Sequence, residues 1–286
     1  MIYTDDAAHD RMIDNFPDSP NTEEAIPTED SIPTGRIASE WDYRASQNPY
    51  HYVDATKRNW NKAEFYAKGL RLVEQIVDPM LDHLKIDPAG KRVLEIGCGI
   101  GRLFEGLSQR FAEVYGIDVS SQMLEYGKAN CPVQAVWIHG DGLSLTGIDS
   151  ETIDYVISYE VIQHIPSKTI IEKYIRESYR VLKQGGGMQL HMRRGSDSLR
   201  QAAVRQLPKP LRQLAASVAN KMNAIEFMGD IDTWLGTTLK PSVAVELASS
   251  VGFEIIEILP DIIHHRNSGY WLVCVKPSRT NSLSRK

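Results

Sequence analysis

The chain has 286 residues, of which 42% are hydrophobic, enough for one large domain or a core domain with additions. Its net charge of −5 argues against a general affinity for nucleic acid. No apolar run approaches the roughly 18 residues that a membrane span requires, and the acidic N-terminus lacks the apolar core of a signal peptide. Three scattered cysteines show no metal-ligand spacing, so we expect a soluble, cytoplasmic protein without a bound metal.

The first 35 residues form an acidic segment. Residues 1–34 contain nine acidic side chains, one basic one and four prolines, without an apolar period. This composition is typical of disorder, and we expect residues 1–35 to be a disordered leader. The charge of the leader also means that the remaining chain is mildly basic.

Residues 36–90 are rich in aromatic side chains. From Trp60 to Leu84 the apolar positions follow a helical period, which predicts one long helix with a bend near Pro79. An aromatic stripe at helical spacing usually packs in the core. The alternative is an N-terminal helical lid that covers a ligand pocket and excludes water.

From residue 91 the pattern alternates between strands and helices. Strands are predicted at 92–96, 113–117, 133–138, 153–158 and 188–192, with helices at 102–111, 121–130 and 168–182 between them. Ser120 or Ser121 suits the N-cap of the second of these helices. Three glycines at 185–187 predict the turn before the fifth strand.

The alternation stops at residue 193 and resumes near residue 241. Residues 193–240 predict a helical insertion with short helices at 198–206 and 210–222. A helix at 241–251 and strands at 253–259 and 270–275 follow, before a loose tail at 277–286. We therefore expect an α/β fold, a doubly wound sheet of seven mostly parallel strands, over residues 91–276.

A glycine loop follows the first predicted strand. Gly97, Gly99 and Gly101 come directly after an apolar run and before a helical pattern, where a ligand can approach the backbone. A dinucleotide-binding loop needs its third glycine at position 102, which is Arg, and no Gly-Lys-Ser/Thr of a phosphate-binding loop is present. What remains is an acid-x-G-x-G-x-G pattern that begins at Glu95.

Together with the Gly-Ile-Asp sequence that ends at Asp118, this pattern resembles the S-adenosyl-L-methionine (SAM) site of class I, Rossmann-like SAM-dependent methyltransferases of the small-molecule type. The resemblance covers roughly residues 90 to 195. It implies SAM as cofactor and a loop of Gly97, Cys98, Gly99 and Gly101 whose backbone N–H groups meet the methionine carboxylate. Glu95 would hold the loop or meet the ammonium group.

The resemblance assigns further cofactor contacts. Asp118 would accept the ribose hydroxyls, with helix capping as the alternative. Val119 would also contact the cofactor, and Met123 would pack on the adenine face. Asp141 and Gly142 would bind the adenine edge, although Asp-Gly is also an ordinary turn dipeptide.

Tyr159 and the segment after the fourth strand would form the floor beneath the sulfonium. Two histidines near strand ends, His164 and His191, are candidates for a base or orienting group, and His264 and His265 are weaker ones. A lone histidine is more often a structural hydrogen-bonding group. Asn48-Pro49-Tyr50 is similar to the N-P-P-Y sequence of amino-methylating enzymes, but it lacks the second proline and precedes the glycine loop.

The start of the insertion is basic. Arg193 and Arg194 precede a stretch with five basic and no acidic side chains between residues 200 and 221. This stretch indicates either a solvated basic face or an anionic acceptor. We expect methyl transfer to a small-molecule or glycan- or lipid-linked acceptor, oxygen being favoured. The alternatives are an NAD(P)-dependent oxidoreductase, a catalytically idle SAM-fold module, and a protein or nucleic-acid methyltransferase.

Overall fold

The computed structural model describes residues 34–165, 167–193, 237–261 and 269–278. Several sequence predictions lie outside these ranges. They concern nearly all of the leader at 1–35, the helices at 198–206 and 210–222, residues 279–286 of the tail, and Arg194, His264 and His265.

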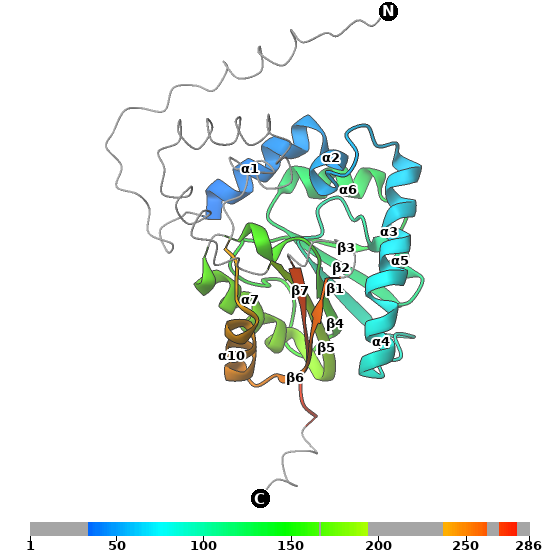
Figure 1. Cartoon of the computed structure of the whole chain (residues 1–286). Helices are drawn as coiled ribbons and strands as arrows, with labels where there is room; N and C mark the ends of the chain where they lie inside the picture. Colours follow the sequence, from blue (N-terminus) through cyan, green and yellow to red (C-terminus); the bar gives the residue numbers. More distant parts are fainter. Residues whose placement is uncertain (1–33, 166, 194–236, 262–268, 279–286) are drawn as a thin grey trace, which may run out of the picture.

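A seven-stranded sheet with strand order β3-β2-β1-β4-β5-β7-β6 forms the centre of the molecule (Figure 1). Strands β1 to β5 are parallel, and β7 runs antiparallel to both β5 and β6. The predicted doubly wound sheet is confirmed. Its strands are β1 (Arg92–Ile96), β2 (Glu113–Asp118), β3 (Val136–His139), β4 (Ile153–Ser158), β5 (Leu182–Arg193), β6 (Glu254–Pro260) and β7 (Gly269–Val275).

Helices cover the two faces of the sheet (Figure 1). On one face α7 (Lys168–Val181) and α10 (Pro241–Val251) pack on an apolar cluster that includes Leu94, Val156 and Leu190. On the other face α3 (Lys62–Ile76), α4 (Asp78–Leu84) and α5 (Phe104–Ser108) pack on a second cluster. Side chains alternate between the faces of a strand, so each buried strand contributes to both clusters.

The N-terminal segment forms four helices. The predicted helix at 60–84 is instead α3 and α4, which meet at Val77, because Pro79 lies in the first turn of α4 where a proline fits best. Ahead of them α1 (Thr34–Gln47) and α2 (Pro49–Val53) lie across the top of the molecule in Figure 1. Asn48 accepts a hydrogen bond from His51 N at 3.1 Å as the N-cap of α2, which gives Asn48-Pro49-Tyr50 a structural role.

The glycines at 185–187 do not form the predicted turn, because they belong to β5. Gly185 N donates to Lys276 O at 2.8 Å and Lys276 N donates to Gly186 O at 3.0 Å, so the chain beyond β7 pairs with them. Gly185 has a φ of 76°, and the pairing of β5 with β4 shifts register in this region. The strand is therefore much longer than the predicted 188–192.

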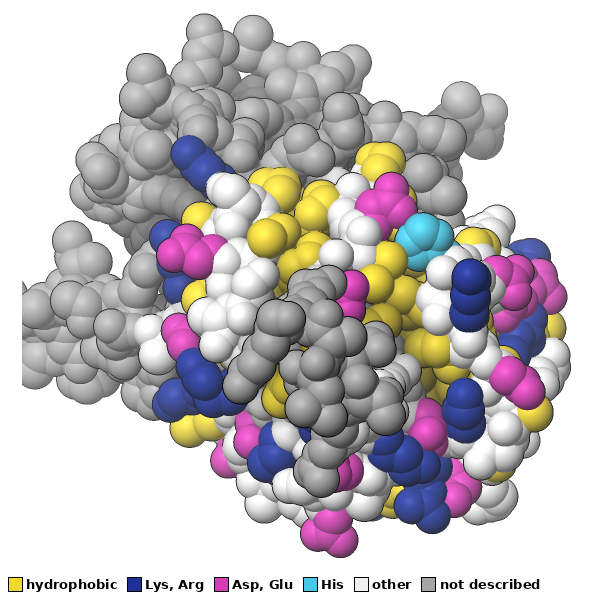
Figure 2. Space-filling model, turned by 90° about the horizontal axis from the view of Figure 1, so that it is seen from below, with side chains coloured by type: hydrophobic (Ala, Val, Ile, Leu, Met, Phe, Trp, Pro, Cys, Tyr) yellow, Lys and Arg dark blue, Asp and Glu magenta, His cyan; other side chains and the backbone are white. Residues whose placement is uncertain are grey.

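The remaining elements follow the prediction with small shifts. Helix α6 (Ser121–Asn130) has Ser120 as its N-cap, and the Ser120 hydroxyl accepts from Met123 N at 3.1 Å. Ion pairs lie at the amino ends of the strands, among them Arg92–Glu113 at 2.7 Å and Lys183–Asp154 at 2.8 Å. Figure 2, viewed from below Figure 1, shows acidic and basic side chains interspersed on the described surface.

Candidate functional site

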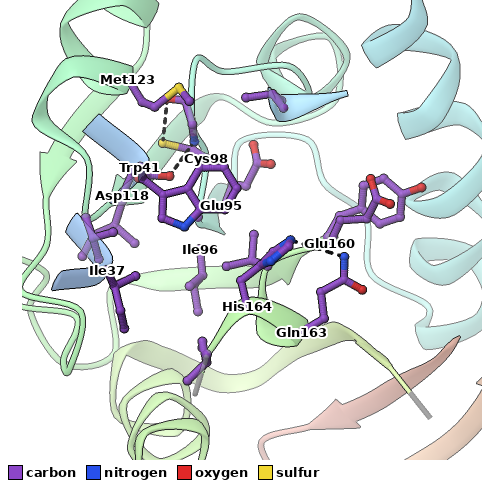
Figure 3. A pocket seen from close by; sticks show the side chains of 18 of the residues that line it. Ile37, Trp41, Glu95, Ile96, Cys98, Asp118, Met123, Glu160, Gln163 and His164 are labelled. Atoms are coloured by element: carbon purple, nitrogen blue, oxygen red, sulfur yellow. Dashed lines mark hydrogen bonds between the residues drawn. The ribbon is translucent and has the colours of Figure 1, made fainter. Parts of the chain in front are cut away.

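A cavity of about 530 Å³ lies at the carboxyl ends of the parallel strands, where ligands bind in open α/β sheets. The ends of β1, β2, β4 and β5 form its walls, and α1 and α2 contribute its roof. In Figure 3, Met123, Cys98 and Asp118 lie at one end of the cavity, which we call the donor end because the resemblance predicts the methyl donor there. His164, Gln163 and Glu160 lie at the other, the acceptor end.

The glycine loop at the donor end is held by hydrogen bonds to β2 and by one within the loop. Gly97 N and Cys98 N both donate to Ile117 O, at 2.8 and 3.2 Å, and Gly101 N donates to Cys98 O at 2.8 Å. With the Gly99 amide bound to Asp118, these four N–H groups all have partners inside the protein. Donation from these N–H groups to a ligand carboxylate stays a prediction.

The glycines instead provide space. Gly97 has a φ of 73°, and a Cβ there would lie 2.4 Å from the methyl groups of Val161. Gly101 does not line the cavity, and its missing side chain accommodates the Trp137 ring, whose Cη2 would lie 2.6 Å from an added Cβ. Gly97 and Gly99 thus shape the cavity, whereas Gly101 serves packing.

Asp118 connects the glycine loop to helix α6. Its Oδ2 accepts from Gly99 N at 2.8 Å and its Oδ1 from Ser120 N at 2.9 Å. Burial raises the pKa of Asp118, while the backbone N–H groups act in the opposite direction. The carboxylate lines the cavity and still has acceptor positions, because two oxygens offer about four lone-pair sites.

Glu95 is a buried acid on the cavity wall. Its Oε2 has no hydrogen-bond partner among the described residues. Burial raises the pKa of Glu95 to about 8, against the charge of Arg102, which lowers it. A buried carboxyl oxygen that lacks a partner fits a cationic group in the cavity, because the positive charge would stabilise the ionised carboxylate.

Three further predicted residues line the donor end: Cys98, Val119 and Met123. Burial raises the pKa of the Cys98 thiol well above its usual value, so the side chain acts as a small apolar filler. Met123 is 1% exposed and packs in a cluster with Phe65, Tyr66 and Ile100.

Gly142 lines the cavity and Asp141 does not. Asp141 Oδ1 accepts from Leu143 N and Ser144 N, both at 2.8 Å, and its Oδ2 accepts from Ser144 Oγ at 2.9 Å. These bonds stabilise a turn, the second of the two roles expected for an Asp-Gly pair. A contact of Asp141 with adenine stays a prediction.

His164 lies at the acceptor end on η2 (Ile162–His164), the short helix after β4. The Trp41 ring meets it edge-on at 5.3 Å, and its Nδ1 has no hydrogen-bond partner among the described residues. Burial and the charges of Arg44 and Arg193 lower the pKa of His164 to about 4. The imidazole is therefore neutral at physiological pH.

His191 does not line the cavity. It lies on β5 with Nε2 3.2 Å from Asp261 Oδ2, and its ring packs against Tyr159 at 5.3 Å and Trp271 at 4.9 Å. Tyr159 does line the cavity, so His191 lies behind a cavity wall. Of the two predicted histidines, His164 lines the cavity and His191 does not.

An ion-pair network joins the roof to the glycine loop, and sequence reasoning missed it. Arg102, directly after the loop, is buried and contacts Asp54 at 3.1 Å and Glu160 at 3.3 Å. Lys68 contacts the same Asp54 oxygen at 2.7 Å. Glu160 adopts a φ of 60°, uncommon for a residue other than glycine and frequent at functional sites.

The roof is also joined to α6. Asp42 of α1 accepts from Ser120 Oγ at 2.6 Å and from Gln122 N at 3.1 Å. Trp41 and Arg44, on the same helix, line the cavity. The lid interpretation therefore fits α1 and α2, whereas α3 and α4 pack on the sheet. In the sequence, the aromatic composition was the signal for the lid. No local pattern indicated the role of Asp42.

The residues present suit a sulfonium nucleoside. Glu95 offers a buried acid with one oxygen that lacks a partner among the described residues, and Asp118 offers carboxylate oxygens on the same cavity. Within the described ranges no group of three His, Cys, Asp or Glu side chains could hold a metal ion. In the same ranges, no helix is long and apolar enough to cross a membrane.

Comparison with known proteins agrees with this geometry. A family model described as a methyltransferase domain matches residues 94–189. The ubiquinone biosynthesis O-methyltransferase of Pseudomonas entomophila (strain L48) is 27% identical over 149 residues, 51% of this chain and 54% of that protein. The chain thus spans about half the length of this curated relative.

Two further similarities are more partial or concern the fold alone. The biotin biosynthesis bifunctional protein BioHC of Cellvibrio japonicus is 34% identical over 107 residues, 37% of this chain and 20% of that protein. The crystal structure of magnesium protoporphyrin IX methyltransferase from Synechocystis PCC 6803 with bound SAH, at 17% identity, covers 85% of this chain and 99% of that chain with a TM-score of 0.55.

Proposed function

We propose that this chain, which belongs to the class I SAM-dependent methyltransferases, transfers a methyl group to an oxygen atom of a small-molecule or glycan- or lipid-linked acceptor. SAM supplies a methyl group already activated on a sulfonium. The protein has mainly to align the acceptor and exclude water, and alignment alone can contribute roughly 7–11 kcal/mol. The similarity to an O-methyltransferase supports oxygen as the acceptor atom.

The observation that carries the proposal is the position of Glu95. Its buried carboxyl lines the same cavity as Asp118 and the glycine loop, with one oxygen that lacks a partner among the described residues. The ammonium group of SAM would provide that partner. Because the pKa of Glu95 is about 8, binding at pH 7 should displace its proton.

The other residues of the donor end have distinct roles in this proposal. Asp118 accepts the ribose hydroxyls while it continues to hold Gly99 and Ser120. Met123, Val119 and Gly142 line the adenine position, and Tyr159 and Val161 lie beneath the sulfonium. The roof of α1 and α2 excludes water from the cavity.

His164 orients the acceptor in this proposal. A neutral imidazole can donate or accept a hydrogen bond, whereas a pKa of about 4 makes it a weak base for a hydroxyl group. His191 acts from behind the wall, by supporting the Tyr159 ring. The role of a base that removes an acceptor proton is therefore not assigned to either histidine.

Isothermal titration calorimetry with S-adenosylhomocysteine (SAH) tests the donor end. We expect binding to the wild type and at least tenfold weaker binding to Asp118→Asn. At pH 7 the binding enthalpy should differ between phosphate and Tris buffers because a proton is released, and Glu95→Gln should remove that difference. Folded protein that produces no heat with SAH would refute the proposal.

Two alternatives are separated by simple measurements. An oxidoreductase should bind NADH, which the same calorimetry tests. A catalytically idle module should bind SAH yet transfer no label from methyl-labelled SAM to a metabolite extract. Transfer of label with no response to NADH is the result expected here.

A further inference from the structure

The proposed methyl transfer still needs a group that removes a proton. An acceptor hydroxyl loses its proton as its oxygen bonds to the methyl carbon, and neither His164 nor His191 is assigned to that step. Among the described residues, His51 and His164 are the histidines that line the cavity. His51 lies on α2, in the roof. It is therefore the second histidine that a ligand in the cavity can contact.

A backbone carbonyl fixes which nitrogen of the His51 ring carries the hydrogen. Nδ1 of His51 lies 3.2 Å from Lys57 O. A carbonyl oxygen can only accept a hydrogen bond, so Nδ1 is the donor. In the neutral ring the basic lone pair is then on Nε2, on the other side of the imidazole from Lys57. Within the described part of the chain Nε2 has no hydrogen-bond partner, so it can accept a proton from a ligand.

The position of His51 does not depend on the bond from its ring alone. The backbone N of His51 donates to Asn48 Oδ1 at 3.1 Å, and Asn48 Nδ2 donates to Arg58 O at 3.0 Å. Helix α2 is thus joined to the segment that contains Lys57 by two hydrogen bonds, of which the His51 ring donates one. A substitution that keeps a donor at Nδ1 should therefore leave the roof in place.

Side-chain contacts along the roof connect His51 to the acceptor end. The ring of Tyr52 packs against the His51 ring at 5.4 Å, and its centre lies 5.8 Å from the Arg44 guanidinium. The same guanidinium lies 4.5 Å from the centre of the Trp41 ring, which meets His164 edge-on at 5.3 Å. Helix α2 is therefore joined by ring contacts to the histidine of the acceptor end.

The same short helix also contacts the donor end. Val53, two residues after His51, has its Cγ2 3.1 Å from the position that a Cβ at Gly99 would occupy. Gly99 belongs to the glycine loop and lines the cavity. Helix α2 thus borders both ends of the cavity, between which the methyl group is transferred in the proposed function.

We infer that His51 is the general base of the reaction and accepts the proton of the acceptor hydroxyl on Nε2. The inference rests on the proposed function and assigns a step that it leaves open. The hydroxyl oxygen forms the bond to the methyl carbon, and the electron pair of the O–H bond stays on oxygen. The carbon–sulfur bond breaks with its electron pair on sulfur. The products are an O-methylated acceptor, neutral SAH and a protonated ring, which is half-buried and returns its proton to solvent.

Nitrogen NMR of protein with isotope-labelled histidine tests the tautomer without an acceptor. In the neutral form of the ring we expect a hydrogen on Nδ1 of His51 and none on Nε2. The His51 signals are identified by their absence from the spectrum of His51→Asn. A hydrogen on Nε2 of the neutral ring would overturn the inference, because that atom could not then accept a proton.

The variant His51→Asn separates the base from the structural bond. Nδ2 of the asparagine can replace Nδ1 as the donor to Lys57 O, but nothing replaces Nε2. With methyl-labelled SAM and a metabolite extract, the single-turnover rate of label transfer should fall about 100-fold or more, as expected for loss of a general base. The affinity for SAH and the free energy of unfolding should be unchanged. His83→Asn, at an exposed position on α4 that contacts Glu257, is the matched control and should keep the wild-type rate.

Chemical rescue distinguishes a base from a structural group. His51→Ala leaves space for a ring, so added imidazole should raise its rate of label transfer, whereas His51→Asn should not respond. Label transfer by His51→Asn at the wild-type rate would overturn the role of His51 and leave methyl transfer itself intact. A wild type that binds no SAH or transfers no label would instead refute the proposed function, so the two failures are distinguishable.

Discussion

The two ends of the cavity are built in different ways. At the donor end, Glu95 and Asp118 come from the adjacent parallel strands β1 and β2, and Gly97 comes from the loop that follows β1. At the acceptor end, Trp41, Arg44, His164 and Arg193 come from α1, η2 and β5, far apart in the sequence. The donor end is thus a local consequence of a short motif, whereas the acceptor end requires the whole fold.

The two ends also contain groups with opposite responses to pH. Burial raises the pKa of the acid Glu95 and lowers the pKa of the base His164. Each group is therefore held in its neutral form in the unliganded protein. Rising pH should destabilise the donor end, and falling pH should destabilise the acceptor end.

The largest expected effect is that of Glu95→Gln on stability. Because the folded-state pKa of about 8 exceeds the unfolded value, the wild type binds more protons when folded, and its stability falls as pH rises from 5 to 8. Three pKa units correspond to about 4 kcal/mol, and the variant should be free of this loss. Urea unfolding of both proteins at pH 5 and pH 8 measures the difference. Parallel pH profiles would show that Glu95 is ionised in the folded protein.

Arg102→Met removes the ion pairs that join the roof to the end of the glycine loop. Removal of one partner from a buried ion pair costs about 3–5 kcal/mol. We expect about 3 kcal/mol, because Asp54 retains its contact with Lys68 at 2.7 Å. Arg176→Met, which removes an exposed pair with Glu172 on α7, is the control and should cost less than about 0.5 kcal/mol. A loss for Arg102→Met as small as that of the control would mean that the network does not hold the roof.

Gly97→Ala should affect the donor end specifically. Its Cβ would meet the methyl groups of Val161 at 2.4 Å, so the loop or the floor has to move. We expect SAH affinity to fall about 100-fold, equivalent to about 2.7 kcal/mol. Gly90→Ala is the matched control, because Gly90 has a similar φ of 71° and no atom within 4 Å of the added Cβ. That variant should lose about 1–2 kcal/mol of stability through backbone strain and keep its affinity.

His164→Gln should have the smallest effect and the opposite pH dependence. The folded-state pKa of about 4 lies below the unfolded value, so the unfolded chain binds more protons and wild-type stability falls as pH decreases from 6.5 towards 4. Between pH 7 and pH 5 the wild type should lose about 2 kcal/mol relative to the variant. Denaturant titrations at the two pH values test this; a wild type that gains stability at pH 5 relative to the variant would reverse the assignment.

This contrast explains how much the sequence could predict. Strand β1, the glycine loop and the capping Ser120 could be predicted from local sequence patterns. The sheet could be predicted from the alternation of strand and helix patterns along the chain. The acceptor end depends on pairs such as Arg102–Asp54, separated by 48 residues, for which no local pattern exists. In the sequence, Arg102 served only to exclude a dinucleotide-binding loop.

Local turn preferences were a second limit on what the sequence could predict. The glycines at 185–187 predicted a turn, but their backbone groups pair with Lys276, and that partner cannot be identified from local residue preferences. Asp141 illustrates the reverse case, because its bonds to Leu143 and Ser144 are those that an Asp-Gly turn predicts.

The contact of Asp42 with the start of α6 has a consequence for how this protein can be shortened. Residues 94–189, the stretch shared with the methyltransferase family model, contain neither Asp42 nor Asp54 and lack both β6 and β7. A fragment cut to that stretch would leave Ser120 and Arg102 without these carboxylates and β5 without its antiparallel neighbour. The stretch matched by the family model therefore leaves out residues that hold the roof and the sheet together.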